Sequence, residues 1–324
     1  MKASFPIDAV VAWVDGNDPI HRAKRMRYSR PEEADNDDIG GEVRYTNVGE
    51  IFYCVASILR FAPWIRYIHI VTDNQDPDLG PFVEKYFPDR KDDIKIVDHS
   101  QIFSGYEEVL PVFNSLSIES MLWRIPGLSE RFVYFNDDIV LLRPLRQEDF
   151  FTERGLVCYA SHMNLCVAKL LRQLKHLGSR HKVFGFKDAM INAADTCGQK
   201  RHIIHFGHTP HPQHRGFLEA FYLANKDLLE SNIRHRFREP NQHNPQELCY
   251  LLAESEGQLE MRSLSGESLF LSPKAKRGYV DRKLKEFEAS PDAKFCCINS
   301  LTDTSLEEQA KVLSWIKYRI GLSD

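Results

Sequence analysis

The stretch VYFNDDIVLLRP, residues 133–144, places two adjacent carboxylates, Asp137 and Asp138, between two apolar runs. Apolar residues on both sides draw the segment into the protein, where unpaired charges are costly. A solvated loop therefore explains the pair less well than a bound cation does. Mg²⁺ and Mn²⁺ prefer hard carboxylate oxygens and often share them with substrate phosphates. The stretch predicts a buried strand that ends at a nucleotide-diphosphate and metal site, with Asp137 as a metal ligand.

The same order, an apolar run followed by polar residues, recurs through the first half of the chain. Strands are predicted at 7–14, 67–72, 93–98 and 131–135, and helices between them at 49–62, 81–87 and 113–125. This alternation predicts a mostly parallel sheet with crossover helices. Polar clusters follow the four strands at 15–18, 73–75, 98–100 and 136–138. Because ligands of open α/β sheets bind outside the carboxyl ends of the strands, the clusters predict one shared site.

The second half is predicted to be more helical. Helices are expected at 166–178, 216–231, 245–257 and 305–321. The last begins with Ser305-x-x-Glu308, a capping-box pattern, and ends near Gly321. No linker, internal repeat or low-complexity tract separates the two halves. We therefore expect one domain with a division of labour near residue 155.

Charge, hydropathy and cysteine content argue against several classes of protein. The chain has 42 basic and 46 acidic residues, so its formal charge of −4 gives no global reason to bind nucleic acid or an anionic membrane. No apolar stretch approaches the roughly 18 residues that a membrane helix needs, and the start runs into a strand instead of a signal peptide. The seven cysteines show no CxxC spacing. Reduced thiols in a cytosolic protein are expected, with zinc or disulfide roles as alternatives.

Several segments together resemble the Stealth family of sugar-phosphate transferases. The first two conserved regions are similar to IDAVVAWVDGNDP (7–19), RYTNVGEIFYCVASILRFAPWIRYIHIVTDNQ (44–75) and LPVFNSLSIESMLWRIPGLSERFVYFNDDIVLL (110–142). A third region resembles HFGHTPHPQHRGFLEAF (205–221) with HRFREPNQHNPQELCYLLA (235–253), and a fourth resembles KFCCINS (294–300). The matches run in order over most of the chain, which makes the resemblance far more specific than one Asp-Asp pair.

The resemblance implies a glycosyltransferase-A-like α/β fold with a mostly parallel nucleotide-sugar-binding sheet. It implies one catalytic domain, 1–324, in which about 1–155 bind the nucleotide sugar and about 156–324 form a more helical acceptor and catalytic half. The implied reaction transfers hexose-1-phosphate, with N-acetylhexosamine-1-phosphate as a candidate, from a nucleotide-diphosphate sugar to a glycan hydroxyl. A phosphodiester forms and a nucleoside monophosphate leaves. We expect a UDP-linked donor, Mg²⁺ or Mn²⁺ as cofactor, and a role in capsular or extracellular polysaccharide synthesis.

The resemblance also assigns residues. Asp138 matches a catalytic carboxylate and His208 a catalytic histidine, and either residue type can accept the proton of the acceptor hydroxyl. We assign the base to His208 and orientation or charge stabilisation to Asp138. Arg238 matches an arginine whose planar fork suits two phosphate oxygens, although it could also belong to a solvated basic segment with Arg234 and Arg236. The expected substrate-binding residues are Trp13, Asp15, Gly16, Arg44, Glu50, Asn136, His211 and Asn299.

The chain departs from the family pattern at one position. The family commonly has Asn-Asp where this chain has Asn299 followed by Ser300, so a metal ligand expected from that Asp is in doubt.

Two sets of residues leave alternatives open. Histidines recur every third residue at 202, 205, 208, 211 and 214, a spacing that could suggest zinc. Pro210 and Pro212 would interrupt a helix there, so we expect core or surface histidines with one catalytic member. A basic segment could attract acceptor phosphates or be a solvated face: Arg172, Lys175, His176, Arg180, His181, Lys182 and Lys187.

Two other functions remain as alternatives to sugar-1-phosphate transfer. One is a metal-dependent glycosyltransferase that forms a glycosidic bond and releases a nucleoside diphosphate. The other is a non-catalytic glycan-binding module. The expected partners are the nucleotide-sugar donor and a glycan acceptor, without nucleic acid. The expected location is the cytoplasm, with the inner face of the cytoplasmic membrane and a capsule-assembly complex as further alternatives.

Overall fold

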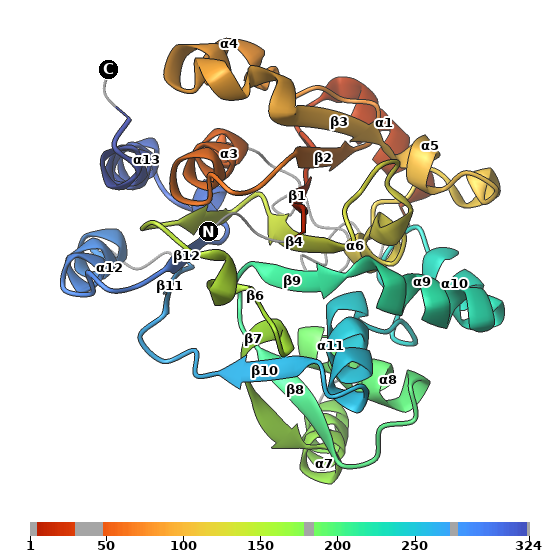
Figure 1. Cartoon of the computed structure of the whole chain (residues 1–324). Helices are drawn as coiled ribbons and strands as arrows, with labels where there is room; N and C mark the ends of the chain where they lie inside the picture. Colours follow the sequence, from red (N-terminus) through yellow and green to blue (C-terminus); the bar gives the residue numbers. More distant parts are fainter. Residues whose placement is uncertain (1–4, 30–47, 178–184, 273–277, 323–324) are drawn as a thin grey trace.

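The computed structural model describes residues 5–29, 48–177, 185–272 and 278–322 of the 324-residue chain. Its central sheet has the strand order β3-β2-β1-β4-β9 (Figure 1). The strands are β1 (Ile7–Ala12), β2 (Ile68–Thr72), β3 (Ile94–Asp98), β4 (Arg131–Asn136) and β9 (His211–His214). The first four are parallel and β9 is antiparallel to β4. The predicted α/β class and mostly parallel sheet are therefore confirmed.

The order of the strands reverses between β1 and β4. From β1 the chain continues on one side through β2 and β3, whereas β4 lies on the other side. Ala12 at the end of β1 pairs with Asn136 at the end of β4. Such a switch point leaves a crevice beyond the carboxyl ends of the two strands, which is where ligands of open α/β sheets bind. The segments after Ala12 and Asn136 therefore border one site.

The helices of the first half follow their strands. They are α1 (Pro19–Tyr28), α3 (Glu50–Phe61), α4 (Leu79–Tyr86), α5 (His99–Ile102) and α6 (Ser115–Glu119), with 3₁₀ turns at Pro88–Asp93, Glu107–Val109 and Leu122–Arg124. In α3 the residues Ile51, Val55, Ile58 and Leu59 share one face and are buried. Burial of each such side chain contributes about 1.5–3 kcal/mol. This anchors α3 against β5, the strand that follows Asp138, and Glu50 is the first residue of the helix.

Two smaller sheets complete the fold. One has the order β10-β7-β6 with β8 paired to β7, and the other has the order β11-β12-β5. Their strands are β5 (Ile139–Leu141), β6 (Phe151–Thr152), β7 (Gly155–Asn164), β8 (His202–Phe206), β10 (Leu259–Arg262), β11 (Ser268–Leu271) and β12 (Phe295–Ile298). The backbone N–H of Ile298 donates to the carbonyl of Asp138 at 2.9 Å. The chain after β12 is thereby fixed against the end of β4.

Helices cover these sheets from several sides (Figure 1). They are α7 (Leu165–Leu177), α8 (Phe186–Thr196), α9 (Arg215–Ala224), α10 (Lys226–Ile233), α11 (Pro245–Ser255), α12 (Tyr279–Glu288) and α13 (Leu306–Ile320), with 3₁₀ turns at Gln147–Asp149 and Leu301–Asp303. The predicted ends of the last helix are confirmed. Ser305 and Glu308 form a reciprocal capping box, and Gly321 ends the helix with φ 75°.

Two predicted helices are wrong as single elements. The segment 113–125 forms the short α6 and a separate 3₁₀ turn. The hydroxyl of Ser120 donates to the carbonyl of Leu116, and the indole N–H of Trp123 donates to the carbonyl of Ser120, so side chains compete there with the backbone donors of a helix. The segment 216–231 is divided into α9 and α10 at Asn225, whose side-chain amide caps the carbonyl of Phe221 at 2.8 Å.

Candidate active site

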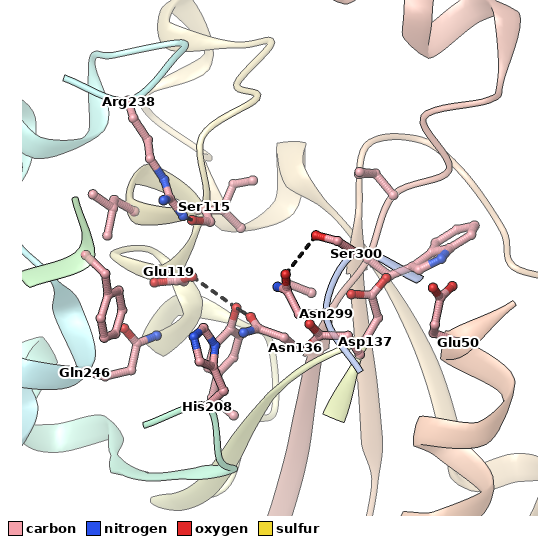
Figure 2. Close-up of a pocket in the computed structure, with 18 of the residues that line it drawn as sticks. Glu50, Ser115, Glu119, Asn136, Asp137, His208, Arg238, Gln246, Asn299 and Ser300 are labelled. Carbon is pink, nitrogen blue, oxygen red and sulfur yellow. Dashed lines mark hydrogen bonds between the residues drawn. The ribbon is translucent and has the colours of Figure 1, made fainter. Parts of the chain in front are cut away.

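A cavity of about 630 Å³ lies at the switch point. Elements from both halves of the chain line it, including the ends of β1 and β4, the start of α3, the loop after β8 and the loop after β12. Figure 2 shows Arg238, Glu119, Gln246 and His208 on one side, Glu50 and Asp137 on the other, and Asn299 and Ser300 between them. The structure brings these predicted residues into the lining: Trp13, Glu50, Asn136, Asp137, Asp138, His208, His211, Arg238 and Asn299.

Of the predicted residues that the structure describes, Asp15 and Gly16 do not line the cavity. Arg44 lies outside the described residues. Asp15 and Gly16 belong to the loop after β1, which is tied to the loop after β2. The backbone N–H of Asp15 donates to Oε1 of Gln75, and Nε2 of Gln75 donates back to the Asp15 carbonyl, both at 2.9 Å. Their roles in binding substrate remain predictions.

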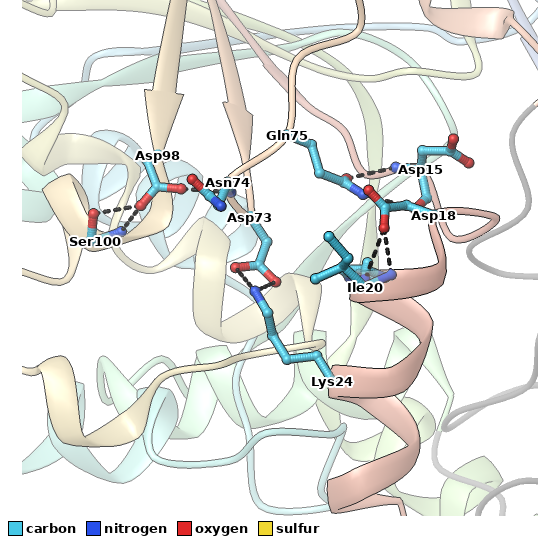
Figure 3. Close-up of polar contacts among 10 residues, drawn as sticks. Asp15, Asp18, Ile20, Lys24, Asp73, Asn74, Gln75, Asp98 and Ser100 are labelled. Atoms are coloured by element: carbon cyan, nitrogen blue, oxygen red, sulfur yellow. Dashed lines mark hydrogen bonds and ion pairs between the residues drawn. The ribbon is translucent and has the colours of Figure 1, made fainter.

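The polar clusters after the first three strands hold one another in place (Figure 3). Lys24 in α1 forms an ion pair with Asp73 at 2.8 Å, and the backbone N–H of Asn74 donates to Oδ2 of Asp98 at 2.6 Å. Asp18 caps α1 by accepting from the backbone N–H of Ile20 and of His21. All three residues of the cluster at 136–138 line the cavity, whereas of the first three clusters only His99 does.

Three carboxyl groups meet at the floor of the cavity. Burial raises the pKa of Asp137 well above its usual range, and the negative charges of Asp138 and Glu50 raise it further. Burial likewise raises the pKa of Glu50. Among the described residues, Oδ1 of Asp138 is buried without a hydrogen-bond partner. Crowded carboxylates with an unused oxygen fit a hard divalent cation, which would neutralise their mutual repulsion.

The second oxygen of Asp138 is occupied. The thiol of Cys297 in β12 donates to Oδ2 at 3.4 Å. Burial raises the pKa of Asp138, while the Cys297 thiol and the nearby charge of His208 oppose that rise. Burial, together with the nearby charge of Asp138, raises the pKa of Cys297 well above its usual range. Cys297 therefore stays a neutral thiol that orients the carboxylate.

His208 is placed by aromatic rings. Its imidazole is stacked against Phe270 at a centroid distance of 5.0 Å and against Phe186 at 6.3 Å, with interplanar angles of 21° and 23°. The residue before it, Gly207, packs closely against Leu264, since a Cβ would lie 2.7 Å from Cδ2 of Leu264 and would require that side chain to shift. The ring is exposed and lines the cavity, although the two aromatic rings pack against it. This arrangement limits rotation and leaves the ring nitrogens available for proton transfer.

Arg238 belongs to a polar group that the sequence did not reveal in full. Its guanidinium donates to Oγ of Ser115 at 2.7 Å. One turn farther along α6, Glu119 is buried, and burial raises its pKa while the charge of Arg238 opposes that rise. The hydroxyl of Tyr134 lies 3.1 Å from Oε1 of Glu119 and 2.8 Å from Oδ1 of Asn136. This group links the arginine to the end of β4.

Ser115, Glu119 and Gln246 line the cavity and were missed in the sequence. The available signal was spacing: Ser115 and Glu119 lie four residues apart in the segment 113–125, where Glu119 is the only acidic residue. Four-residue spacing places both on one face of a helix, and a Glu that is buried there needs a polar partner.

The five regularly spaced histidines do not form one cluster. They lie on the strands β8 and β9 and on the loop between them, not on a helix. His202 contacts Glu254, His211 lies 3.2 Å from the hydroxyl of Tyr250, and His214 lies 3.4 Å from Glu130. Burial, with a smaller effect of His208, lowers the pKa of His211 to about 3, so it is neutral. A zinc site made of all five is excluded by this separation.

The cysteines and the basic segment can also be placed. All seven cysteines lie within the described residues and none is paired, as expected for reduced thiols. In the basic segment, Arg172 donates to Oδ1 of Asn192 at 3.0 Å, while Arg180, His181 and Lys182 lie outside the described residues.

Comparison with known proteins decides the family. The pattern of Stealth protein conserved region 1 matches residues 5–30, and that of conserved region 2 matches residues 44–159. The receptor polysaccharide phosphotransferase WefC of Streptococcus gordonii is 32% identical over 258 residues, which cover 74% of this chain and 75% of that protein. The chain belongs to the Stealth family.

Other Stealth relatives carry similar names. The capsular polysaccharide phosphotransferase fcs1 of Haemophilus influenzae is 32% identical, over 75% of this chain and 64% of that protein. The exopolysaccharide phosphotransferase SCO2594 of Streptomyces coelicolor is 33% identical over 94% of this chain, which matches 48% of that longer protein. These names agree with the expected terms transferase, capsule and polysaccharide.

Solved structures with a related layout are glycosyltransferases. The galactosyltransferase LgtC in complex with donor and acceptor sugar analogues covers 97% of this chain, and 95% of LgtC is covered, at 10% identity and a TM-score of 0.44. Mouse xyloside xylosyltransferase 1 covers 91%, and 98% of it is covered, at 11% identity and a TM-score of 0.41. At such scores the fold class of this Stealth chain rests on its own strand order. Of the helices in the described residues, none is both long and apolar enough to cross a bilayer.

Proposed function

We propose that the chain transfers a hexose-1-phosphate from a nucleotide-diphosphate sugar to a hydroxyl of an acceptor glycan. N-acetylhexosamine-1-phosphate is a candidate for the transferred group and UDP for the donor nucleotide. The product is a phosphodiester, and a nucleoside monophosphate leaves. The proposed setting is capsular or extracellular polysaccharide synthesis, which the names of the phosphotransferase relatives support.

One observation carries the proposal. Asp138, His208 and Arg238 are separated by up to 100 residues in sequence but line one cavity at the switch point of the sheet. Phosphoryl transfer needs an oriented nucleophile, a proton acceptor and neutralisation of charge on the phosphoryl oxygens. A histidine, an arginine and grouped carboxylates around one cavity meet those needs.

The residues can be given roles on this basis. In the proposal the first half of the single domain binds the donor, with the nucleotide near Trp13, whose buried indole N–H lacks a partner among the described residues. Arg238, fixed by Ser115, binds phosphoryl oxygens, since a guanidinium stays charged throughout the reaction. His208 accepts the proton of the acceptor hydroxyl, and Asp138 orients that hydroxyl or stabilises the protonated imidazole. The second half of the domain supplies the acceptor side.

A divalent cation fits the floor of the cavity. Asp137 would hold it, with Asp138 and Glu50 beside it, and Asn299 and Ser300 of the fourth family region line the same cavity. Bound Mg²⁺ or Mn²⁺ would supply charge neutralisation for the phosphates. The proposal does not depend on an Asp at position 300, where this chain has Ser.

The test is the identity of the products. The purified chain is incubated with Mg²⁺, a panel of UDP-sugars and other nucleotide sugars, and candidate acceptor glycans, and phosphorus NMR resolves the products. The proposal expects a new phosphodiester resonance together with a nucleoside monophosphate. Release of a nucleoside diphosphate without a phosphodiester would instead establish a glycosyltransferase that forms a glycosidic bond.

Substitutions separate the enzyme from a non-catalytic glycan-binding module. Asp138→Asn, His208→Ala and Arg238→Ala should each lower turnover at least about tenfold while folding is retained. Two matched controls are available. His205 is an exposed histidine on β8, and Arg236 donates to the carbonyl of Leu110 at 3.3 Å without lining the cavity. His205→Ala and Arg236→Ala should keep turnover, and equal losses in both sets would contradict the assignments.

Attachment to the inner face of the cytoplasmic membrane is proposed as the finer location. One face of α7 supports it, because it exposes apolar residues at helical spacing: Val167, Leu170, Leu171 and Leu174. The same helix carries Lys169, Arg172 and Lys175, which suit an anionic surface. The chain should sediment with phosphatidylglycerol vesicles, and Leu170→Glu with Leu174→Glu should release it. A wild-type chain that stays in the supernatant would contradict this location.

A further inference from the structure

A second group of metal-ligating side chains lies outside the cavity. It consists of His162 on β7, His202 at the start of β8 and Glu254 in the last turn of α11. None of the three lines the cavity. Glu254 is eight residues from Gln246 on the same helix, which corresponds to about 12 Å along the helix axis. This group is therefore separate from the carboxylates at the floor of the cavity.

The three side chains converge on one point. Nε2 of His162 lies 2.7 Å from Oε1 of Glu254, and Nε2 of His202 lies 2.8 Å from Oε2 of the same carboxylate. The two imidazole centroids are 3.9 Å apart at an interplanar angle of 39°. Each nitrogen faces a different oxygen, so one carboxylate serves both rings.

The strand register explains this meeting. In the antiparallel pair β7–β8, His162 pairs with Ile204 and Asn164 pairs with His202. His202 and Ile204 are two residues apart on one strand, so His202 and His162 project from the same face of the ribbon. On this side the backbone N–H of Ile204 donates to Oε1 of Glu247 at 2.7 Å, which fixes β8 against α11. Glu254 lies two turns farther along that helix.

The donor set is that of a zinc site. Two imidazole nitrogens and a carboxylate are a known set of three protein ligands for Zn²⁺, which leaves a fourth position for water or another ligand. Ligand atoms around tetrahedral zinc lie about 3.3 Å apart, since Zn–N and Zn–O are about 2.0–2.2 Å. The three ligand atoms here all lie within 4.8 Å of one another, so small side-chain rotations would bring them to that geometry. The half-exposed His162 gives an ion access from solvent.

We propose that His162, His202 and Glu254 bind Zn²⁺ at a site distinct from the catalytic cavity. The ion would replace the protons between the imidazoles and the carboxylate, because metal binding needs the neutral imidazole with a free Nε2. It would join β7, β8 and α11. Of these, β8 leads to His208 and α11 carries Gln246, and both residues line the cavity. The site stabilises the packing of these three elements in the second half of the chain and takes no part in proton transfer.

The test uses the full chain without an affinity tag, first stripped of metal. Zn²⁺ alone is titrated while Tm is measured, and Co²⁺ is titrated while visible ligand-field absorption is recorded. With excess Mg²⁺ present to occupy the carboxylates of the cavity, the proposal expects one Zn²⁺ per chain at this site, an increase in Tm with Zn²⁺, and the intense absorption of four-coordinate Co²⁺. His202→Ala and Glu254→Gln should each weaken Zn²⁺ binding at least about a hundredfold, because even changes behind the ligands cost about 10–100-fold.

Two variants act as controls for position. His205→Ala, an exposed histidine on the same strand, should bind Zn²⁺ as the wild type does. Asp138→Asn should also keep the Zn²⁺ site, because its carboxylate belongs to the cavity. Glu254→Gln preserves the shape and size of the side chain, so a loss of Zn²⁺ binding with an unchanged metal-free Tm reports coordination and not unfolding. Absence of Co²⁺ absorption in the wild type, or equal Zn²⁺ affinity in the wild type and Glu254→Gln, would reduce the group to hydrogen-bonded histidines and overturn the proposal.

Discussion

Sγ of Cys297 lies 3.4 Å from Oδ2 of Asp138, so a buried thiol from β12 orients a carboxylate at the end of β4. The thiol also opposes the increase in the pKa of Asp138 that burial causes. β12 is antiparallel to β5, which follows Asp138 directly, and this pairing holds the two side chains together. A residue outside the cavity lining thereby influences the ionisation of one inside it.

We predict that Cys297→Ala moves the acidic limb of the pH–rate profile to higher pH. Without the thiol donor the pKa of Asp138 rises, so a higher pH is needed to ionise this carboxyl group. Turnover at its pH optimum should fall less than about tenfold, because Cys297 is not an acid–base group of the reaction. The control is Cys296→Ala, which truncates the neighbouring buried residue on the opposite face of β12. Identical profiles for the two variants would contradict the assignment.

Asp137→Asn should stabilise the metal-free protein while it lowers activity. The pKa of Asp137 is raised, so between the unfolded and folded pKa values the native state binds more protons and stability falls as pH rises. At neutral pH the variant removes this cost, and an increase of about 0.5–2 kcal/mol in the free energy of unfolding is expected. Turnover should fall by about 10²-fold or more, because the proposed metal ligand is lost.

Chemical denaturation of the metal-free wild type and Asp137→Asn at several pH values checks this prediction. The stability difference should grow from acidic to neutral pH, and added Mg²⁺ should stabilise the wild type more than the variant. A variant less stable than the wild type at every pH would show that Asp137 is a structural residue instead of a strained ligand.

The sequence predicted the central sheet because its signals are local. Each parallel strand is a short apolar run bounded by polar residues, and the four predicted strands match β1 to β4 within two residues at either end. The smaller sheets depend on pairings between distant segments, such as β5 with β12. Such pairings produce no periodic pattern in the sequence from which they could be predicted. The segment with Pro210 and Pro212 did not suggest a strand, yet β9 pairs there as an edge strand, where Pro is tolerated.

The residues of the candidate site also differ in whether local sequence could predict them. Asp137 and Asp138 follow directly from the end of a strand, so the sequence alone predicted their position at the site, whereas Trp13 was assigned beside the family resemblance. His208 and Arg238 were assigned through resemblance, since nothing local relates a loop histidine to an arginine 30 residues later. The supporting contacts of Cys297, Ser115 and Phe270 depend on how separate sheets pack, and sequence spacing carries no signal for them.

Ser300→Asp tests the departure from the family pattern. Ser300 lines the cavity, its backbone has φ 55°, and its hydroxyl donates to Oδ1 of Asn299 at 2.7 Å. Asp tolerates this left-handed conformation, so the substitution adds a carboxylate without new backbone strain. One added charge near the ion is worth about 1 kcal/mol in water, so Mn²⁺ should bind at least about fivefold more tightly. Titration of Mn²⁺ by calorimetry measures this, and Ser300→Ala controls for loss of the hydroxyl. Equal affinity in both variants would place the metal away from residue 300.

Asp8→Asn should destabilise the fold in a pH-dependent way. Asp8 is buried in β1, where it pairs with Arg66 at 2.7 Å and accepts from the backbone N–H of Ser129 at 2.8 Å. Burial would raise its pKa, but hydrogen bonds from His69, Arg66 and Ser129 outweigh it and hold the pKa well below its usual range. The stabilisation is therefore present above the unfolded pKa of about 3.9 and is lost as pH falls toward the lower folded value.

At pH 7 the loss should be about 1.5–3 kcal/mol, the range for hydrogen bonds to a charged group, because Arg66 is 37% exposed and water can solvate its guanidinium once the carboxylate is lost. The control is Asp292→Asn, which removes an exposed pair with Arg143 and should cost no more than about 1 kcal/mol. Unfolding in urea from pH 3 to pH 7 measures both variants against the wild type. The gap between wild type and Asp8→Asn should narrow as the pH falls below about 4. A gap that stays constant with pH would mean that Asp8 acts through packing and hydrogen-bond geometry, not through its charge.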